Sequence, residues 1–181
     1  IHNGFTPFTQ TVDTLARHRT EGGVVVLVSN SPRSEAGVTR QLDEIGVRRD
    51  AYDAAVTSGD VTRKLIAEGP KKIFFIGADR DTPLLDGLGT EIVEEDEAEI
   101  IVCAGFFDDE TETPEMYQEL LARFAARNVP MICANPDLMV ERGHKLIPCA
   151  GALAALGAPV EHEVVLDHAP FAGRGEALRP L

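Results

Sequence analysis

Short apolar runs recur along this chain and alternate with segments that carry apolar residues at helical spacing. The runs are Val24–Val28, Ala54–Thr57, Lys72–Ile76, Ile100–Cys103 and Met131–Ala134. Runs without polar alternation are typical of strands in a parallel sheet that is covered on both faces. The alternation therefore predicts an α/β fold with mostly parallel sheets, in which ligands bind beyond the carboxyl ends of the strands.

Helices are expected between these strands. In the segment PFTQTVDTLARHRTEGG, Val12, Leu15 and Ala16 share one helical face. A second helix is predicted to follow Pro32, since proline presets a helical φ. Three more are predicted to start at Ser58, at Thr113 and at about Ala150, and the last of these ends near Leu156.

Four strand ends carry small polar or charged side chains: SNSPR (29–33), TSGD (57–60), GADRD (77–81) and ANPD (134–137). A helix that follows Pro32 would point free N–H groups toward Ser29, and Ser31 and Arg33 add further donors, which suits an anion. Simple capping of that helix by Ser31 or Ser34 is the alternative. A structural turn is the alternative for ANPD, and Asp60 can simply complement a helix dipole.

The overall charge excludes several classes of partner. The 181 residues carry a formal net charge of −13, which disfavours binding to nucleic acid and to anionic membrane. Any phosphate site must therefore be built locally. The three cysteines are expected to be buried, reduced thiols of a cytoplasmic protein, and His2 and His144 lack the spacing of metal ligands.

Familiar nucleotide and hydrolase signatures are missing from the sequence. It contains no Walker loop, no GxGxxG after a strand and no GxSxG turn. The strand–helix alternation still permits a flavodoxin-like or dinucleotide-binding domain, although the lack of a glycine-rich first loop argues against it.

Six segments occur in a characteristic order: IHNG, LVSNSPR, VTSGDVTRKLIA, KIFFIG, ICANPD and ERGHKLIPCAGALA. Together they resemble class IIA of the haloacid dehalogenase-like (HAD) hydrolases, the NagD-like phosphatases, over about residues 1–156. The resemblance implies a Rossmann-like core with a large α/β cap domain inserted after the second motif. It assigns residues 1–53 to a partial core and residues 54–156 to the cap, and it leaves residues 157–181 as an irregular tail.

The resemblance also implies a function and a set of site residues. Members of this family are Mg²⁺-dependent phosphatases of small phosphorylated metabolites, and an aspartate nucleophile takes up the phosphoryl group before hydrolysis. Ser29 matches the residue that holds this group, and Asn30 and Arg33 lie beside it as further phosphate-binding candidates. The candidates on the substrate side are His2, Asn3 and Gly4 in the loop after the nucleophile strand, and Asn135 and Asp137 in the cap.

Other family motifs find no match. The nucleophile strand would precede residue 1, Lys145 lies before the small-residue helix rather than after it, and an acidic metal-binding loop would lie beyond residue 181. We therefore expect no catalytic residue and no metal ligand within the chain, as in a truncated or frame-shifted gene product, and we leave open whether it is an enzyme. The alternative function is a non-catalytic cap or binding module that self-associates, for example as a homo-oligomer through the cap.

Overall fold

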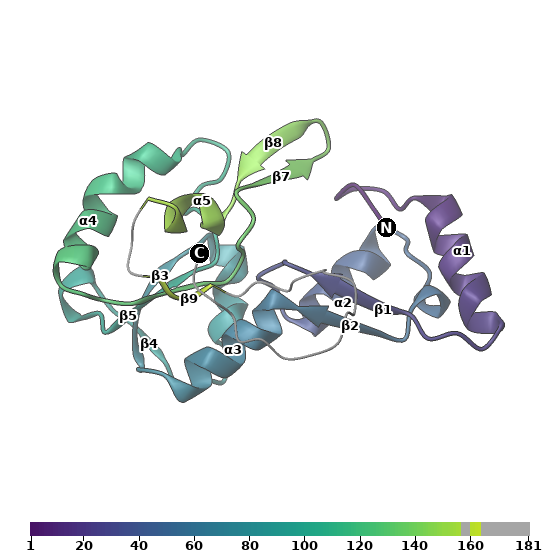
Figure 1. The fold of residues 1–181 in the computed structure, drawn as a ribbon, viewed down its shortest axis with the longest axis horizontal. Coiled ribbons are helices and arrows are strands. Elements are labelled where there is room, and N and C mark those ends of the chain that lie inside the picture. Colours follow the sequence, from purple (N-terminus) through teal and green to yellow (C-terminus); the bar gives the residue numbers. More distant parts are fainter. Residues whose placement is uncertain (157–159, 164–181) are drawn as a thin grey trace, which may run out of the picture.

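The computed structural model describes residues 1–156 and 160–163 and has two lobes (Figure 1). The smaller lobe holds the parallel strands β1 (Val26–Ser29) and β2 (Ala54–Thr57). The helices α1 (Thr9–Thr20) and α2 (Glu35–Glu44) and the 3₁₀ turn η1 (Arg49–Ala51) lie in the same lobe. Its core includes Val12 and Ala16 of α1, which lie on the predicted inner face, together with Val38 and Leu42 of α2.

The larger lobe is built on a five-stranded sheet in the order β4-β3-β5-β6-β9, and every pair in it is parallel. Its strands are β3 (Lys72–Ile76), β4 (Glu91–Ile92), β5 (Ile100–Cys103), β6 (Met131–Cys133) and β9 (Val160–Glu163). The central strand β5 is buried at every position, as expected of an apolar run between two covered faces.

Helices and 3₁₀ turns complete this lobe. They are α3 (Ser58–Glu68), η2 (Asp79–Leu85), η3 (Glu95–Glu97), η4 (Pro114–Tyr117), α4 (Gln118–Ala126) and α5 (Ala150–Ala154). One hydrophobic core holds Leu121 and Phe124 of α4 with Leu153 of α5. A second core joins Ile66 of α3 to Leu84 of η2, so the sheet is packed on both faces.

An antiparallel hairpin, which the sequence analysis did not predict, projects beside the larger sheet. Its strands are β7 (Met139–Arg142) and β8 (Lys145–Pro148), and Gly143 turns between them at φ +66°. The sequence here is rich in charge, and β7 is largely exposed, so the apolar signal that marks the other strands is absent.

The predicted fold class is confirmed: the chain is α/β with mainly parallel sheets. Lys72–Ile76 and Ile100–Cys103 are strands with the predicted bounds. The expected division into residues 1–53 and 54–156 stays a prediction, and the boundary falls between the paired strands β1 and β2. Among the described residues, no helix is long and apolar enough to cross a membrane.

The helix predicted to follow Pro32 begins at Glu35, because Ser34 is extended and its Oγ accepts a hydrogen bond from the N–H of Gly37 (3.4 Å). Two other local predictions need correction. At Thr113 the chain first forms the 3₁₀ turn η4, and α4 begins only at Gln118. Residues 160–163 of the expected irregular tail form β9, which extends the sheet beside β6; residues 157–159 and 164–181 lie outside the described residues.

Two glycines bring helices against the loops that follow strands. A Cβ on Gly59, in the first turn of α3, would lie 2.3 Å from the carbonyl oxygens of Pro32 and Arg33. A Cβ on Gly151, in α5, would lie 2.2 Å from the carbonyl oxygen of Pro136. Each glycine thus allows a helix to pack directly against one polar loop, and any side chain at that position would clash with the loop backbone.

Replacing Gly59 with alanine tests this close approach. We expect the free energy of unfolding in urea to fall by about 1–3 kcal/mol, because either the loop or α3 must shift. This loss would outweigh the roughly 1 kcal/mol by which alanine is the better helix former. Gly105→Ala is the matched control, since a Cβ there meets no atom within 4 Å. Equal stability of the two variants would contradict the packing described here.

Candidate functional site

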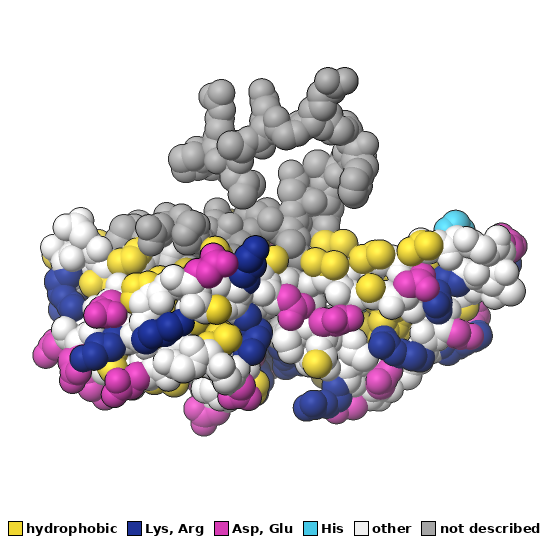
Figure 2. All heavy atoms as spheres, turned by 90° about the horizontal axis from the view of Figure 1, so that it is seen from below, with side chains coloured by type: hydrophobic (Ala, Val, Ile, Leu, Met, Phe, Trp, Pro, Cys, Tyr) yellow, Lys and Arg dark blue, Asp and Glu magenta, His cyan; other side chains and the backbone are white. Residues whose placement is uncertain are grey.

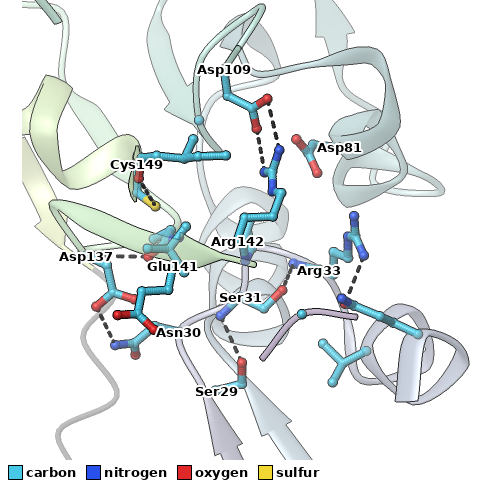
Figure 3. A pocket seen from close by; sticks show the side chains of 18 of the residues that line it. Ser29, Asn30, Ser31, Arg33, Asp81, Asp109, Asp137, Glu141, Arg142 and Cys149 are labelled. Carbon is cyan, nitrogen blue, oxygen red and sulfur yellow. Dashed lines mark hydrogen bonds and ion pairs between the residues drawn. The ribbon is translucent and has the colours of Figure 1, made fainter. Parts of the chain in front are cut away.

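A cavity of about 740 Å³ lies between the two lobes (Figure 3). Its wall is formed by the segments that follow β1, β3, β5 and β6, by the loop before α1 and by the β7–β8 hairpin. Since parallel strands direct their carboxyl ends to one edge of a sheet, this is where an α/β fold is expected to bind its ligand. All eight predicted site residues line this cavity: His2, Asn3, Gly4, Ser29, Asn30, Arg33, Asn135 and Asp137.

The SNSPR loop is folded by its own hydroxyls. The N–H of Ser31 donates to Ser29 Oγ (3.1 Å), and the N–H of Arg33 donates to Ser31 Oγ (3.3 Å). The Arg33 guanidinium donates to Gln41 Oε1 of α2 (3.0 Å). The loop therefore presents two hydroxyls and a cation to the cavity without relying on the amino terminus of α2, whose capping was the alternative explanation for Ser34.

Asn30 connects the two lobes. Its Nδ2 donates to Asp137 Oδ1 (3.1 Å), a contact between residues that lie 107 positions apart. Asn135 Oδ1 accepts from the N–H of Asp137 (3.1 Å), so ANPD is a structural turn as well as part of the cavity wall. The buried Oδ1 of Asn30 has no hydrogen-bond partner among the described residues, which leaves an acceptor for a donor on a ligand.

The loop before α1 is held by two of its own side chains. Asn3 Oδ1 accepts from the N–H of Thr6 (2.9 Å), and His2 Nδ1 accepts from the N–H of Gly4 (2.8 Å). Partial burial lowers the pKa of His2, because it disfavours the imidazolium. The imidazole is thus a neutral wall of the cavity at pH 7, while His144 lies exposed outside it.

The polar strand end TSGD (57–60) forms hydrogen bonds that hold two helix starts, and it does not contribute to the cavity. Asp60 Oδ2 accepts from the N–H of Glu35 (2.9 Å) and from the hydroxyl of Thr57 (2.7 Å), and the N–H of Asp60 donates back to Thr57 Oγ1 (3.1 Å). Asp60 thus caps the start of α2 from the neighbouring helix, and neither Thr57 nor Asp60 lines the cavity.

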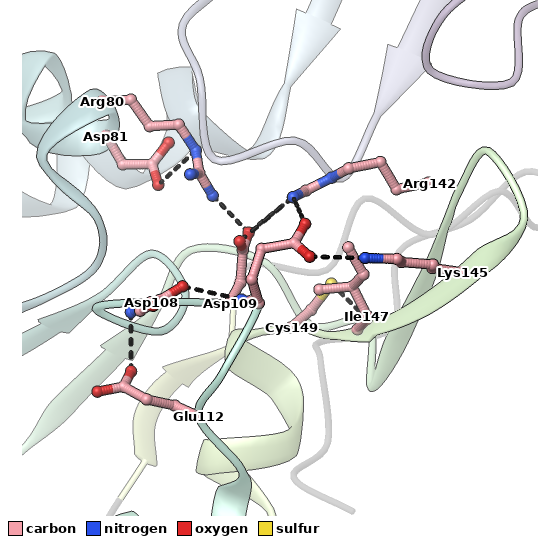
Figure 4. Close-up of polar contacts among 10 residues, drawn as sticks. Arg80, Asp81, Asp108, Asp109, Glu112, Arg142, Lys145, Ile147 and Cys149 are labelled. Carbon is pink, nitrogen blue, oxygen red and sulfur yellow. Dashed lines mark hydrogen bonds and ion pairs between the residues drawn. The ribbon is translucent and has the colours of Figure 1, made fainter.

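Sequence reasoning missed a network of ion pairs on the wall formed by the larger lobe (Figure 4). Asp109, in the segment after β5, accepts two hydrogen bonds from Arg142 of β7 (2.7 and 3.2 Å) and one from Arg80 of η2. Glu110 accepts from Lys145 of β8 (2.9 Å). These contacts hold the hairpin to the sheet, and they place two guanidinium groups on the cavity wall.

Charge and burial set the protonation of this wall. The hydrogen bonds and charges of Arg142 and Arg80 lower the pKa of Asp109, whose side chain is only 10% exposed. Burial raises the pKa of the neighbouring Asp81, although Arg80 and Arg33 partly offset this effect. Burial likewise raises the pKa of Cys149 to about 11, so its thiol is protonated at pH 7.

The cysteine prediction agrees with these positions. Cys103, Cys133 and Cys149 are all buried, and none of the three is joined in a disulfide. Burial also raises the pKa of Cys103 well above its ordinary value. A buried and protonated thiol acts as a small apolar side chain rather than as a nucleophile.

The comparisons with known proteins agree with the fold. Residues 1–91 match the family model of haloacid dehalogenase-like hydrolases. A hydrolase of the haloacid dehalogenase-like family from Brucella suis 1330 is 57% identical to this chain, with a TM-score of 0.84. That match covers 86% of this chain and 57% of the other.

Two phosphatase structures are also similar. A p-nitrophenyl phosphatase from Archaeoglobus fulgidus is 29% identical, with a TM-score of 0.65, and the match covers 86% of this chain and 59% of that one. A 4-nitrophenylphosphatase from Thermotoga maritima shares the fold at 22% identity and a TM-score of 0.63, with coverage of 91% and 66%. The chain thus spans less than two thirds of the length of each of these three proteins. No curated protein matches it.

Asp109→Asn tests the ion-pair network through its pH dependence. Because the folded-state pKa is lowered, the carboxylate stabilises the fold above its unfolded pKa of about 3.9, and this contribution is lost as the pH falls through the folded-state pKa. We expect the free energy of unfolding of the variant to be about 1–3 kcal/mol lower than that of the unsubstituted protein at pH 7. The difference should shrink at pH 3, as measured by urea unfolding at both pH values.

Asp13→Asn is the control for this experiment, since Asp13 pairs with Arg48 on the exposed surface. We expect it to change stability by less than about 1 kcal/mol at either pH. A pH-independent loss in Asp109→Asn would show that the residue acts through packing and not through its charge.

Proposed function

The chain belongs to class IIA of the haloacid dehalogenase-like hydrolases. From that premise we propose that its residues form the phosphate-binding and substrate-selecting part of a Mg²⁺-dependent phosphatase that acts on small phosphorylated metabolites. Phosphatases among its structural neighbours support phosphorylated small molecules as the substrate class. In this proposal the larger lobe is the cap that selects the substrate. Three buried cysteines that form no disulfide support a cytoplasmic location.

One observation carries the proposal: the SNSPR loop opens into the cavity between the lobes, at the carboxyl end of β1. We assign the phosphate group to Ser29, Asn30 and Arg33, since hydroxyl, amide and guanidinium donors suit phosphate oxygens. The remainder of the substrate then faces His2, Asn3 and Gly4 on one side and Asn135 and Asp137 on the other. The unpartnered Oδ1 of Asn30 would accept a hydrogen bond from a hydroxyl of the bound molecule.

The residues that the structure describes do not fit a Mg²⁺ site on their own. Among them, no group of three carboxylate, histidine or cysteine side chains is arranged to hold a metal ion. Asp109 is committed to two arginines, and Asp137 accepts from Asn30. We therefore derive no step through the metal, and we assign only phosphate binding and substrate selection to these residues.

Ser29→Ala tests the phosphate assignment. We expect the affinity for inorganic phosphate, measured by isothermal titration calorimetry, to fall about 10- to 100-fold, because a hydrogen bond to a charged group is lost. Ser29→Thr should retain most of the affinity, since it keeps the hydroxyl. Thr14→Ala, which removes an exposed hydroxyl of α1, is the control. Unchanged phosphate affinity in Ser29→Ala would reject the assignment.

A second candidate function is a non-catalytic binding module that self-associates. The observation in its favour is that two of the four carboxylates on the cavity wall, Asp109 and Asp137, are already engaged by Arg142 and Asn30. Exposed valines on β1, namely Val26 and Val28, offer a surface for self-association.

Hydrolysis of p-nitrophenyl phosphate distinguishes the two candidates. For the 181-residue polypeptide we expect no turnover above background, with or without Mg²⁺, because a missing carboxylate nucleophile abolishes this kind of phosphoryl transfer. The release of p-nitrophenol is followed by its absorbance. Turnover that depends on Mg²⁺ and disappears in Ser29→Ala would establish that the polypeptide is itself a phosphatase and would exclude the second candidate.

A further inference from the structure

A second cavity, of about 490 Å³, lies on the other side of Arg33 between α2 of the smaller lobe and η2 of the larger lobe. Four arginines line it: Arg33 and Arg40 from the smaller lobe, and Arg63 and Arg80 from the larger lobe. Figure 2 shows basic side chains along the boundary between the lobes. Such a concentration of cations is unusual for a chain with a formal net charge of −13.

Three of these arginines have no direct ion-pair partner among the residues that the structure describes. Within the described part of the chain, Arg33, Arg40 and Arg63 form no ion pair. Arg63 is fixed instead by main-chain carbonyl oxygens, those of Leu84 (2.8 Å) and Asp86 (2.8 Å) among them. Arg33 donates to the uncharged Gln41 (3.0 Å). Two guanidiniums are thus held in place by neutral groups, with their charge uncompensated by a direct contact.

Acidic side chains line the same cavity but do not neutralise it. They are Glu44, Asp81 and Asp86, so three carboxylates face four guanidiniums. Of these three, only Asp81 forms an ion pair, with Arg80 (3.9 Å). The lining thus has one guanidinium more than it has carboxylates. The charge of Arg33 acts on Asp81, and Glu44 lies one helical turn after Arg40 on α2, but neither arginine forms a direct ion pair with a described carboxylate.

We propose that this second cavity is a binding site for a small oxyanion, a carboxylate or phosphate group, held by Arg33, Arg40 and Arg63. Guanidinium groups bind both kinds of oxyanion through paired N–H donors. The site is separate from the phosphate position at Ser29, which does not line the second cavity. Arg33 lines both cavities, so an anion in the second cavity competes for the guanidinium that a phosphate in the first would use.

Arg40→Gln tests the proposal, because Arg40 lines only the second cavity and is exposed on α2, where glutamine is well tolerated. The probes are tricarballylate, which carries only carboxylates, and inorganic phosphate, both titrated calorimetrically at low ionic strength. We expect Arg40→Gln to weaken at least one of them about tenfold or more. The probe that is weakened identifies whether the site takes carboxylate or phosphate.

Two further variants complete the test. Arg17→Gln removes an exposed arginine of α1 away from both cavities and should leave both affinities unchanged. Ser29→Ala should leave tricarballylate binding unchanged, because Ser29 does not line the second cavity. The Ser29 variant therefore tests the phosphate site of the first cavity, and the Arg40 variant tests the second cavity independently. The proposal is overturned if Arg40→Gln and Arg17→Gln bind both probes alike, or if neither probe binds the unsubstituted protein at the second cavity.

Discussion

Parallel strand pairing is the constraint on which the site depends. β1 and β2 pair in parallel in one lobe, and all five strands of the larger sheet pair in parallel in the other. The segments after β1, β3, β5 and β6 consequently meet around one cavity, although they are far apart in the sequence. Gly59 and Gly151 then let α3 and α5 support two of these segments closely. The positions of these loops are therefore determined mainly by strand pairing and helix packing, and the polar side chains on them depend on those positions.

The arginines show how an acidic chain can build cationic sites. Asp109 accepts hydrogen bonds from Arg80 and Arg142 on the wall of the first cavity, and its negative charge partly cancels their positive charge there. Arg33 and Arg63 are oriented by an amide and by main-chain carbonyl groups, which position a guanidinium without cancelling its charge. The difference matters because a cation already paired with a carboxylate offers less to an incoming anion than one held by neutral acceptors.

Much of the fold could be predicted from the sequence, because the strands of a covered parallel sheet are continuous apolar runs. KIFFI and IIVC are strands with the expected bounds for this reason. The start of α2 could not be fixed in the same way, since the φ of Pro32 suits a turn as well as a helix, and capping by Ser34 decides the outcome. The β7–β8 hairpin escaped prediction because contacts such as that of Arg142 with Asp109, 33 residues away, hold it.

The candidate site likewise contains some residues that the sequence could identify and others that it could not. SNSPR and ANPD could be recognised because their composition is unusual directly after a strand, and the structure brings both to one cavity, where their roles stay a prediction. Arg142 carries no such local mark, since an arginine on a charged strand is ordinary in sequence. Arg80 lies in the strand end GADRD, but its contact with Asp109 could not be read from that segment.

The placement of these two arginines follows from contacts with Asp109 inside the larger lobe, and the docking of the two lobes then completes both cavities. The contact between Asn30 and Asp137 spans this boundary, and Arg33 stands on it with a face toward each cavity. Any change in how the lobes sit must therefore alter both cavities together, so residues at the boundary such as Arg33 connect the two proposed binding sites.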